Sequence, residues 1–286
     1  MDTSKLAKRM KEFYEEIPKN KLMRRCPVVI RCDGRSFHTL TRNFKRPFDE
    51  VLIKTMQETT KYMCENIQGC VLGYTQSDEI SLVLIDYKRL DSQAWFDYEV
   101  QKMCSIAASM ATMAFNKFFA HEVAAQSKRL YTKYLNDNDS SYIDALEKAL
   151  NKGAMSDARV FNVPKEEVAN YIYWRQLDAS RNSIQMVGQA NFSHRALQNK
   201  SCNDIQDMLM DFKGINWNDL PAYQKRGSCV IRIENTETIR EENIGTDGSV
   251  IGTKVTVRPK WVIDKNIPIF KGGDRKYIED LVMVGE

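Results

Sequence analysis

The 286-residue sequence has no long hydrophobic run: no stretch reaches the ~18 consecutive apolar residues of a membrane-spanning helix. Its first residues, MDTSKLAKRMKEFYEEI, are charged and lack the apolar core of a secretory signal peptide. Histidine occurs only three times, and none of the seven cysteines belongs to a CxxC pair. Neither a zinc site nor a disulfide framework is therefore expected, and the sequence predicts a cytoplasmic protein without a membrane partner.

Hydrophobic residues make up 43% of the chain, which is enough for a folded core. The formal net charge of +4 permits a nucleic-acid partner without requiring one. For a chain of this length we expect one main domain with a smaller extension. The boundary is predicted near residue 165, so that residues 1–165 form the catalytic domain and residues 166–286 the extension.

Hydrophobic periodicity predicts a charged helix over residues 2–17, followed by the order strand, helix, strand, strand, helix, strand. The strands are expected at 27–32, 70–74, 80–86 and 158–164. The helices are expected at 49–67, with Asp49 as the N-cap, and at 92–119. A polar loop is expected over 136–141. After mostly helical residues 165–212, two strands at 228–235 and 250–257 should flank a turn at 246–248.

This order is the split βαβ pattern of ferredoxin-like sheets. The predicted fold class is α+β: an antiparallel βαββαβ sheet like a polymerase palm, with helices on one face, plus a helical and β-hairpin C-terminal extension. Nucleotidyl cyclases and many binding modules use the same arrangement, so the fold alone does not name a function.

Acidic residues stand at two points that this fold brings together. Asp33 ends the first strand, and Asp78 and Glu79 lie in the turn before the third strand. Because the first and third strands are antiparallel neighbours, these residues should meet at one sheet edge. Mg²⁺ prefers oxygen ligands, usually one or two carboxylates plus phosphates and water, and two such ions can promote phosphoryl transfer.

Gly34 follows Asp33 and would let the backbone approach a metal or a phosphate. The run from Arg35 to His38 offers a guanidinium, a hydroxyl, an aromatic ring that could stack on a base, and an imidazole. Simpler interpretations remain open, because Asp-Gly is common in turns and Ser-Asp-Glu is common at solvated hairpin tips.

Four segments carry a resemblance to a known family: VVIRCDGRSF (28–37), GYTQSDEISLV (73–83), YIYWRQLDA (171–179) and, more weakly, PAYQKRG (221–227). In order and spacing they resemble the motifs of the tRNA-His guanylyltransferase-like family, over most of residues 27–230. The resemblance implies a palm fold whose chemistry runs in the 3′-to-5′ direction, adding nucleotides to the 5′ end of a tRNA. It also implies two Mg²⁺ ions, ATP, GTP or other nucleoside triphosphates as substrates, and a homotetramer built as a dimer of dimers.

The resemblance also implies roles for individual residues. Asp33 and Asp78 would be the catalytic metal ligands, with the Gly34 carbonyl as a backbone ligand, and Glu79 would support the acidic site as a third catalytic residue. The nucleotide-binding residues would be Arg31, Gly34, Arg35, Ser36, Phe37, His38, Arg46, Ser77, Lys102 and Arg159.

One departure from the family pattern matters for the substrate. After the Trp-Arg-Gln-x-Asp element, tRNA-His enzymes carry His-Ile-Asn-Asn-Leu-Tyr-Asn, whereas residues 180–186 here read SRNSIQM. The chain therefore looks like the guanylyltransferase-like branch, which resembles a template-dependent repair polymerase for 5′-truncated tRNAs.

Basic residues elsewhere could bind tRNA phosphates, although each could equally be a solvated surface charge. Arg175 could instead pair with Asp178 three residues along one helix. Trp174 and Trp217 could stack on bases or be buried. The candidates for tRNA binding are Arg175, Arg181, Asn182, Arg195, Lys200, Lys225 and Arg226.

Three alternatives remain open. The first is a dedicated tRNA-His guanylyltransferase that adds the extra 5′ G, and the second is a nucleotidyl cyclase on the same architecture. The third is a non-catalytic RNA-binding module with a decayed site. The missing signature argues against the first, the Trp-Arg-Gln-x-Asp element against the second, and intact Asp33, Asp78 and Glu79 against the third.

Overall fold

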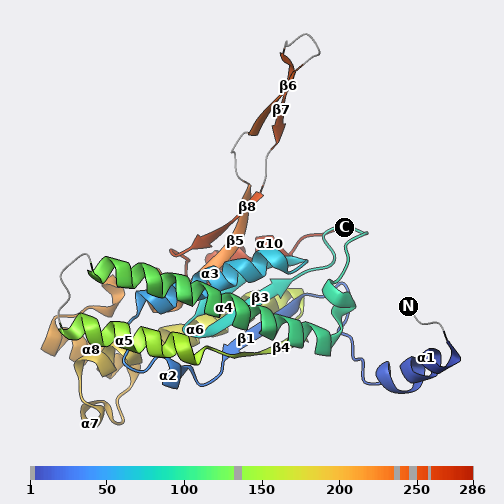
Figure 1. Ribbon diagram of the computed structural model, residues 1–286. Coiled ribbons are helices and arrows are strands. Elements are labelled where there is room, and N and C mark those ends of the chain that lie inside the picture. The colour runs from blue at the N-terminus through green and yellow to red at the C-terminus, as the bar shows by residue number, and fades with distance from the viewer. Residues whose placement is uncertain (1–3, 132–136, 235–238, 245–249, 257–258, 286) are drawn as a thin grey trace.

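The computed structural model describes residues 4–131, 137–234, 239–244, 250–256 and 259–285. Its centre is a six-stranded antiparallel sheet in the order β4-β1-β3-β2-β5-β8. These strands are β1 (Val28–Gly34), β2 (Cys70–Gln76), β3 (Glu79–Leu84), β4 (Ser156–Asn162), β5 (Ser228–Glu234) and β8 (Pro259–Asp264). Strands β6 (Ile239–Ile244) and β7 (Val250–Thr256) form a separate two-stranded arm that projects from the body (Figure 1).

Helices cover both faces of the sheet, because successive side chains of a strand point to opposite sides. Val28 and Ile30 face the core under α3 (Glu50–Asn66) and α4 (Val100–Tyr131), which also receives α5 (Asp137–Lys152). Val29 and Val83 face a second core under α6 (Lys165–Asn191) and α10 (Lys276–Val282). The predicted palm-like α+β fold is confirmed, and the C-terminal extension covers the second face of its sheet.

The remaining elements are short or peripheral. The chain begins with α1 (Lys5–Met10), which continues as a π-helical turn, η1 (Lys11–Glu15), and neither contains a buried residue. The others are α2 (Phe37–Leu40), η2 (Trp95–Tyr98), α7 (His194–Leu197), α8 (Cys202–Lys213), η3 (Trp217–Asp219), α9 (Ala222–Arg226) and η4 (Gly272–Arg275). None of the helices in the described ranges combines the length and apolar character needed to cross a bilayer.

Asp49 is the N-cap of α3, as predicted. Its carboxylate accepts hydrogen bonds from the Leu52 amide at 3.0 Å and the Tyr142 hydroxyl at 2.7 Å. The first satisfies one of the free amides of the helix terminus, and the second ties α5 to α3. The cap thus fixes where α3 begins, directly after the loop that carries Arg46.

Three predicted boundaries around the long helix are wrong. The helix ends at Tyr131 rather than 119. The helix begins at Val100 rather than 92, because Phe96, Asp97 and Tyr98 adopt left-handed backbone angles that a continuous α-helix cannot include. The expected polar loop at 136–141 becomes the start of α5 from Asp137 onward. Residues 137–141 are all polar in sequence, and Tyr142 and Ile143 are buried, so the start of α5 lacks the apolar period that would reveal a helix.

The expected pairing of the strands at 228–235 and 250–257 is also wrong. β5 pairs with β2 on one side and with β8 on the other, where Cys229 lies opposite Asp264, whereas β7 pairs with β6. The predicted turn at 246–248 lies outside the described residues. The chain after β8 places Ile267 and Phe270 in the second core, so their burial supports the β5–β8 pairing.

Candidate active site

The predicted meeting of the first and third strands is confirmed. β1 and β3 are antiparallel neighbours in which Asp33 lies opposite Glu79. The hairpin before β3 is tighter than predicted, with only Ser77 and Asp78 between β2 and β3. Ser77 adopts a left-handed backbone (φ 51°), and Asp78 follows it. Both aspartates therefore lie at the same edge of the sheet.

The two carboxylates interact electrostatically. Burial raises the pKa of Asp78, and the negative charge of Asp33 raises it further, while the Ser77 hydroxyl, donating at 3.1 Å, acts in the opposite direction. A cation between the two groups would remove this repulsion. Among the described residues no cluster of three His, Cys, Asp or Glu side chains could hold a metal. Two aspartates beside a tight turn nevertheless fit Mg²⁺, which is usually held by one or two carboxylates plus substrate phosphates and water.

Phe37 occupies the space beside Gly34. A Cβ at Gly34 would lie 2.3 Å from the Phe37 ring, so the glycine is required by the packing of its own turn. The ring is buried and meets Phe115 edge-on, with centroids 5.1 Å apart. The prediction that a base stacks on Phe37 is therefore wrong for this conformation, because the ring belongs to the core.

Glu79 lies beneath the site in a buried ion cluster. Arg175 donates two hydrogen bonds of 2.7 Å to its two carboxylate oxygens, and Arg31 approaches at 2.8 Å. Arg31 was predicted to contact nucleotide and Arg175 to contact tRNA. In the structure both guanidinium groups instead neutralise Glu79. Glu79 itself is 3% exposed and faces these arginines rather than a metal position. The alternative pair between Arg175 and Asp178 is confirmed at 2.9 Å.

Other predicted nucleotide ligands are exposed around the aspartates or further away. Arg35 and Ser36 lie in the turn after β1, where Ser36 also has a left-handed backbone (φ 56°), and His38 lies on the following helix α2. Arg159 on β4 is paired with Asp157 at 3.6 Å. The side chains of Arg46, Ser77 and Lys102 are also exposed. The ammonium group of Lys102 lies 4.8 Å from the centre of the Phe96 ring. Their roles remain predictions.

Some of the residues predicted to bind tRNA are exposed, and others are partly or fully buried. Arg181, Arg195 and Lys200 are exposed, while Asn182 and Arg226 are half-buried. Arg181 also pairs with Asp178 at 2.6 Å. The prediction that Lys225 binds tRNA is wrong, because its side chain is buried and donates to the Asn218 carbonyl. This burial lowers the pKa of Lys225. Of the two tryptophans that were considered for stacking on bases, Trp174 is 52% exposed, whereas the Trp217 indole donates a hydrogen bond to the Ser183 hydroxyl.

Sequence reasoning missed one carboxylate near the site, Asp157 on β4, which lies opposite Asp33 in the strand register. It identified Asp178 as a partner of Arg175, and that carboxylate also pairs with Arg181. The spacing of residues 175, 178 and 181 on one helix indicates this second pair. No local pattern reveals Asp157, because its position depends on the β1–β4 pairing.

Comparison with known proteins places this geometry in a family. A family model described as tRNAHis guanylyltransferase matches residues 7–164, more than half of the chain. The chain belongs to the tRNAHis guanylyltransferase family. The members of this family are nucleotidyltransferases, so the protein is an enzyme of that type, which binds nucleotides and acts in tRNA processing.

Solved structures of family members resemble this one along their whole length. A bacterial tRNA(His) guanylyltransferase-like protein in complex with ATP is 40% identical with a TM-score of 0.75, covering 97% of this chain and 98% of that chain. A bacterial protein of the same description in complex with GTP is 36% identical with a TM-score of 0.71, covering 98% and 100%. The tRNA(His) guanylyltransferase of Saccharomyces cerevisiae is 25% identical over 225 residues, covering 74% of this chain and 84% of its own.

Proposed function

We propose that this tRNAHis guanylyltransferase family member adds nucleotides to the 5′ ends of truncated tRNAs in the 3′-to-5′ direction, guided by a template base. The observation that carries the proposal is the meeting of Asp33 and Asp78 at one edge of a palm-like sheet. The ATP and GTP complexes of the bacterial relatives support nucleoside triphosphates as its substrates.

The reaction has two steps when the tRNA carries a 5′-monophosphate. An oxygen of that phosphate attacks the α-phosphorus of ATP, which releases pyrophosphate and leaves a 5′-adenylylated end. The 3′-hydroxyl of the incoming nucleotide then attacks the 5′ phosphorus of the tRNA, loses its proton and expels AMP. A tRNA with a 5′-triphosphate needs only the second step, which then releases pyrophosphate.

Such phosphoryl transfer needs positioning and charge neutralisation more than a covalent nucleophile. Asp33, Asp78 and the Gly34 carbonyl would hold two Mg²⁺ ions, which neutralise phosphate charge and lower the pKa of the attacking hydroxyl. Arg35, Ser36 and Ser77, in the turns beside the aspartates, and His38 on α2 would orient the triphosphate. Arg46, Lys102 and Arg159 are further proposed contacts to phosphate.

Residues 180–186 lie close to the proposed reaction site, at the position where tRNA-His enzymes carry their signature. Because this chain lacks that signature there, repair is favoured over dedicated tRNA-His activity. Asn182, Ser183 and Met186 line a cavity of about 80 Å³ together with Ser77. In this position a side chain can influence which 5′ end is accepted. With SRNSIQM in place of the family signature, we propose that base pairing with the opposite strand selects the added nucleotide.

The test uses tRNA transcripts that lack their first 5′ nucleotide, with each of the four bases opposite the gap. Wild-type protein with Mg²⁺, ATP and all four nucleoside triphosphates should add the complementary nucleotide to each, as resolved by denaturing electrophoresis. Growth confined to tRNA-His would establish the dedicated enzyme instead. A cyclic nucleotide formed without RNA would establish a cyclase, and no product at all would leave an RNA-binding module.

The exposed basic residues of the extension support its proposed role in binding tRNA. Arg181, Arg195 and Lys200 lie on or beside α6 and α7, away from the core clusters. We assign catalysis to residues 1–165, and tRNA binding and assembly as a homotetramer, a dimer of dimers, to residues 166–286. Sedimentation of the purified protein at several concentrations tests the assembly.

A further inference from the structure

A second cavity lies at the opposite end of the sheet from the aspartates. Its volume is about 770 Å³, within the range of roughly 300–1,000 Å³ that is usual for small-molecule sites. It is lined by Gly69, Cys70 and Val71 at the start of β2, whereas Asp78 follows the end of that strand. At about 3.3 Å per residue, the length of β2 puts the cavity about 20 Å from the proposed active site.

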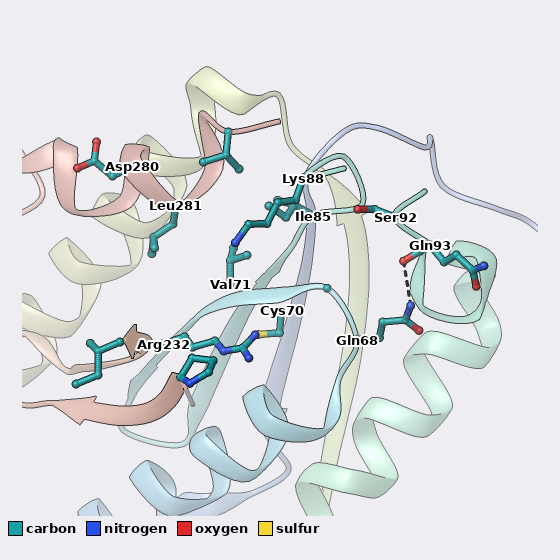
Figure 2. A pocket seen from close by; sticks show the side chains of 14 residues that line it. Gln68, Cys70, Val71, Ile85, Lys88, Ser92, Gln93, Arg232, Asp280 and Leu281 are labelled. Carbon is teal, nitrogen blue, oxygen red and sulfur yellow. Dashed lines mark hydrogen bonds between the residues drawn. The ribbon is translucent and has the colours of Figure 1, made fainter. Parts of the chain in front are cut away.

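Two cationic side chains reach into this cavity from different elements. Lys88 follows β3, and Arg232 lies on β5, where the pairing of Leu72 with Ile231 sets it beside the first residues of β2. Figure 2 shows both side chains extending over β2, Lys88 toward Val71 and Arg232 toward Cys70. Neither takes part in an ion pair found among the described residues, and both are exposed. Asp280 on α10 also lines the cavity, but Figure 2 shows its carboxylate directed away from both cations. Two positive charges that extend over the same strand, with no ion-pair partner among the described residues, favour an anion.

The rest of the lining suits a nucleoside. Val71, Leu281 and Val284 provide an apolar wall, and Figure 2 shows Leu281 pointing from α10 toward the cavity. Gln68 and Gln93 line its far side, where the Gln68 side-chain amide donates a 3.3 Å hydrogen bond to the Gln93 backbone carbonyl. Apolar surface beside a cationic pair matches a phosphate joined to a sugar and a flat base.

We propose that this cavity is a second nucleotide site, in which Lys88 and Arg232 bind phosphate and the wall formed by Val71, Leu281 and Val284 packs against the base. The nucleotide has two possible sources with the same chemistry: a free nucleoside triphosphate, or one nucleotide of the bound tRNA. The tRNA source rests on the proposed function, whereas the free-nucleotide source does not.

The test compares a double variant, Lys88→Gln with Arg232→Gln, with a matched control, Arg89→Gln with Lys276→Gln. The control removes the same charge from two exposed residues near the cavity that do not line it. The first measurement is the stoichiometry of ATP binding without RNA, by calorimetry with Mg²⁺. A free-nucleotide site predicts one ATP fewer per chain in the double variant than in wild type and control.

The second measurement is the affinity for an unmodified tRNA transcript across a salt series. A tRNA nucleotide in the cavity predicts unchanged ATP stoichiometry, tRNA affinity at least about tenfold weaker, and a salt slope smaller by about one, because one phosphate is no longer neutralised. Circular dichroism and Tm must match those of the control. The inference is overturned if the double variant equals the control in ATP stoichiometry, tRNA affinity and salt slope. The proposed function fails separately, if wild-type protein adds no nucleotide.

Discussion

At the scale of single residues, the proposed active site depends on Asp78, whose charged carboxylate is destabilised by its surroundings. Asp78 is buried in part and feels the charge of Asp33, and both effects raise its pKa. A cost to stability accepted at a functional position is common, because the same charge is needed to bind a cation. The negative charge of the aspartate pair therefore lowers the stability of the folded protein but is needed for activity.

Asp78→Asn should stabilise the metal-free protein and abolish nucleotide addition. The folded-state pKa of Asp78 lies above its unfolded value, so the favourable contribution present at low pH is lost as pH rises through the folded pKa. At neutral pH, removing the charge should raise Tm by on the order of one or two degrees. Addition should fall at least about a hundredfold, because a Mg²⁺ ligand is removed.

Differential scanning fluorimetry and the 5′-addition assay measure both effects. Mg²⁺ with a nucleoside triphosphate should raise the Tm of wild type but not that of Asp78→Asn. Asp91→Asn, at an exposed position, is the control and should change neither stability nor activity. A variant that is less stable than wild type at neutral pH would contradict the electrostatic account.

Arg175→Ala should cost on the order of 3 kcal/mol in the free energy of unfolding, measured by urea denaturation. It removes both 2.7 Å hydrogen bonds to the buried Glu79, which keeps its ion pair with Arg31 and a 3.4 Å hydrogen bond from the Ser81 hydroxyl. Arg181→Ala breaks an ion pair to the same helix, but that side chain is 66% exposed, so it should cost less than about 1 kcal/mol. Equal costs for the two variants would show that burial does not control the cluster.

At the scale of elements, the turns at the ends of β1 and β2 place the site. Each turn contains a serine with a left-handed backbone, Ser36 or Ser77, next to the residues proposed to bind phosphate. Strand pairing fixes where each turn lies, and the buried Phe37 ring anchors the first of them. The geometry of the site thus depends on core packing a few residues away.

Gly34→Ala tests this dependence. The added methyl would meet the Phe37 ring at 2.3 Å, so the ring or the turn must move, at a cost of about 1–3 kcal/mol. Nucleotide addition should fall together with stability. Gly273→Ala, where nothing lies within 4 Å, should stay within about 0.5 kcal/mol of wild type. If Gly34→Ala kept full stability, the proposed packing role of the glycine would be wrong.

At the scale of the whole molecule, the extension completes the sheet and also carries exposed basic side chains. β5 and β8 extend the palm sheet beyond β2, while α6 covers its second face. Arg195 and Lys200 are exposed near α7. With a net charge of only +4, affinity for a polyanion must depend on where such residues gather rather than on total charge.

Replacing Arg195 and Lys200 by Gln together should weaken tRNA binding and lower its salt slope by about one for each tRNA phosphate that is no longer neutralised. Filter binding over a salt series measures both quantities. Lys148→Gln with Lys152→Gln, on exposed positions of α5, removes the same charge as a control. An unchanged slope in the first variant would place the tRNA elsewhere on the molecule.

The sequence alone determined the local features: the strand that carries Asp33, the turn that carries Asp78, the cap at Asp49, and the element order that predicts β1 and β3 as neighbours. These follow from periodicity and turn chemistry, which act over a few residues. Only the tertiary structure decided which charges neutralise one another and which strand pairs with β5. Glu79 and Arg175 are 96 residues apart, and β8 joins the sheet with the burial of Ile267 and Phe270. Burial and ion pairing depend on such distant neighbours, and no local pattern specifies them.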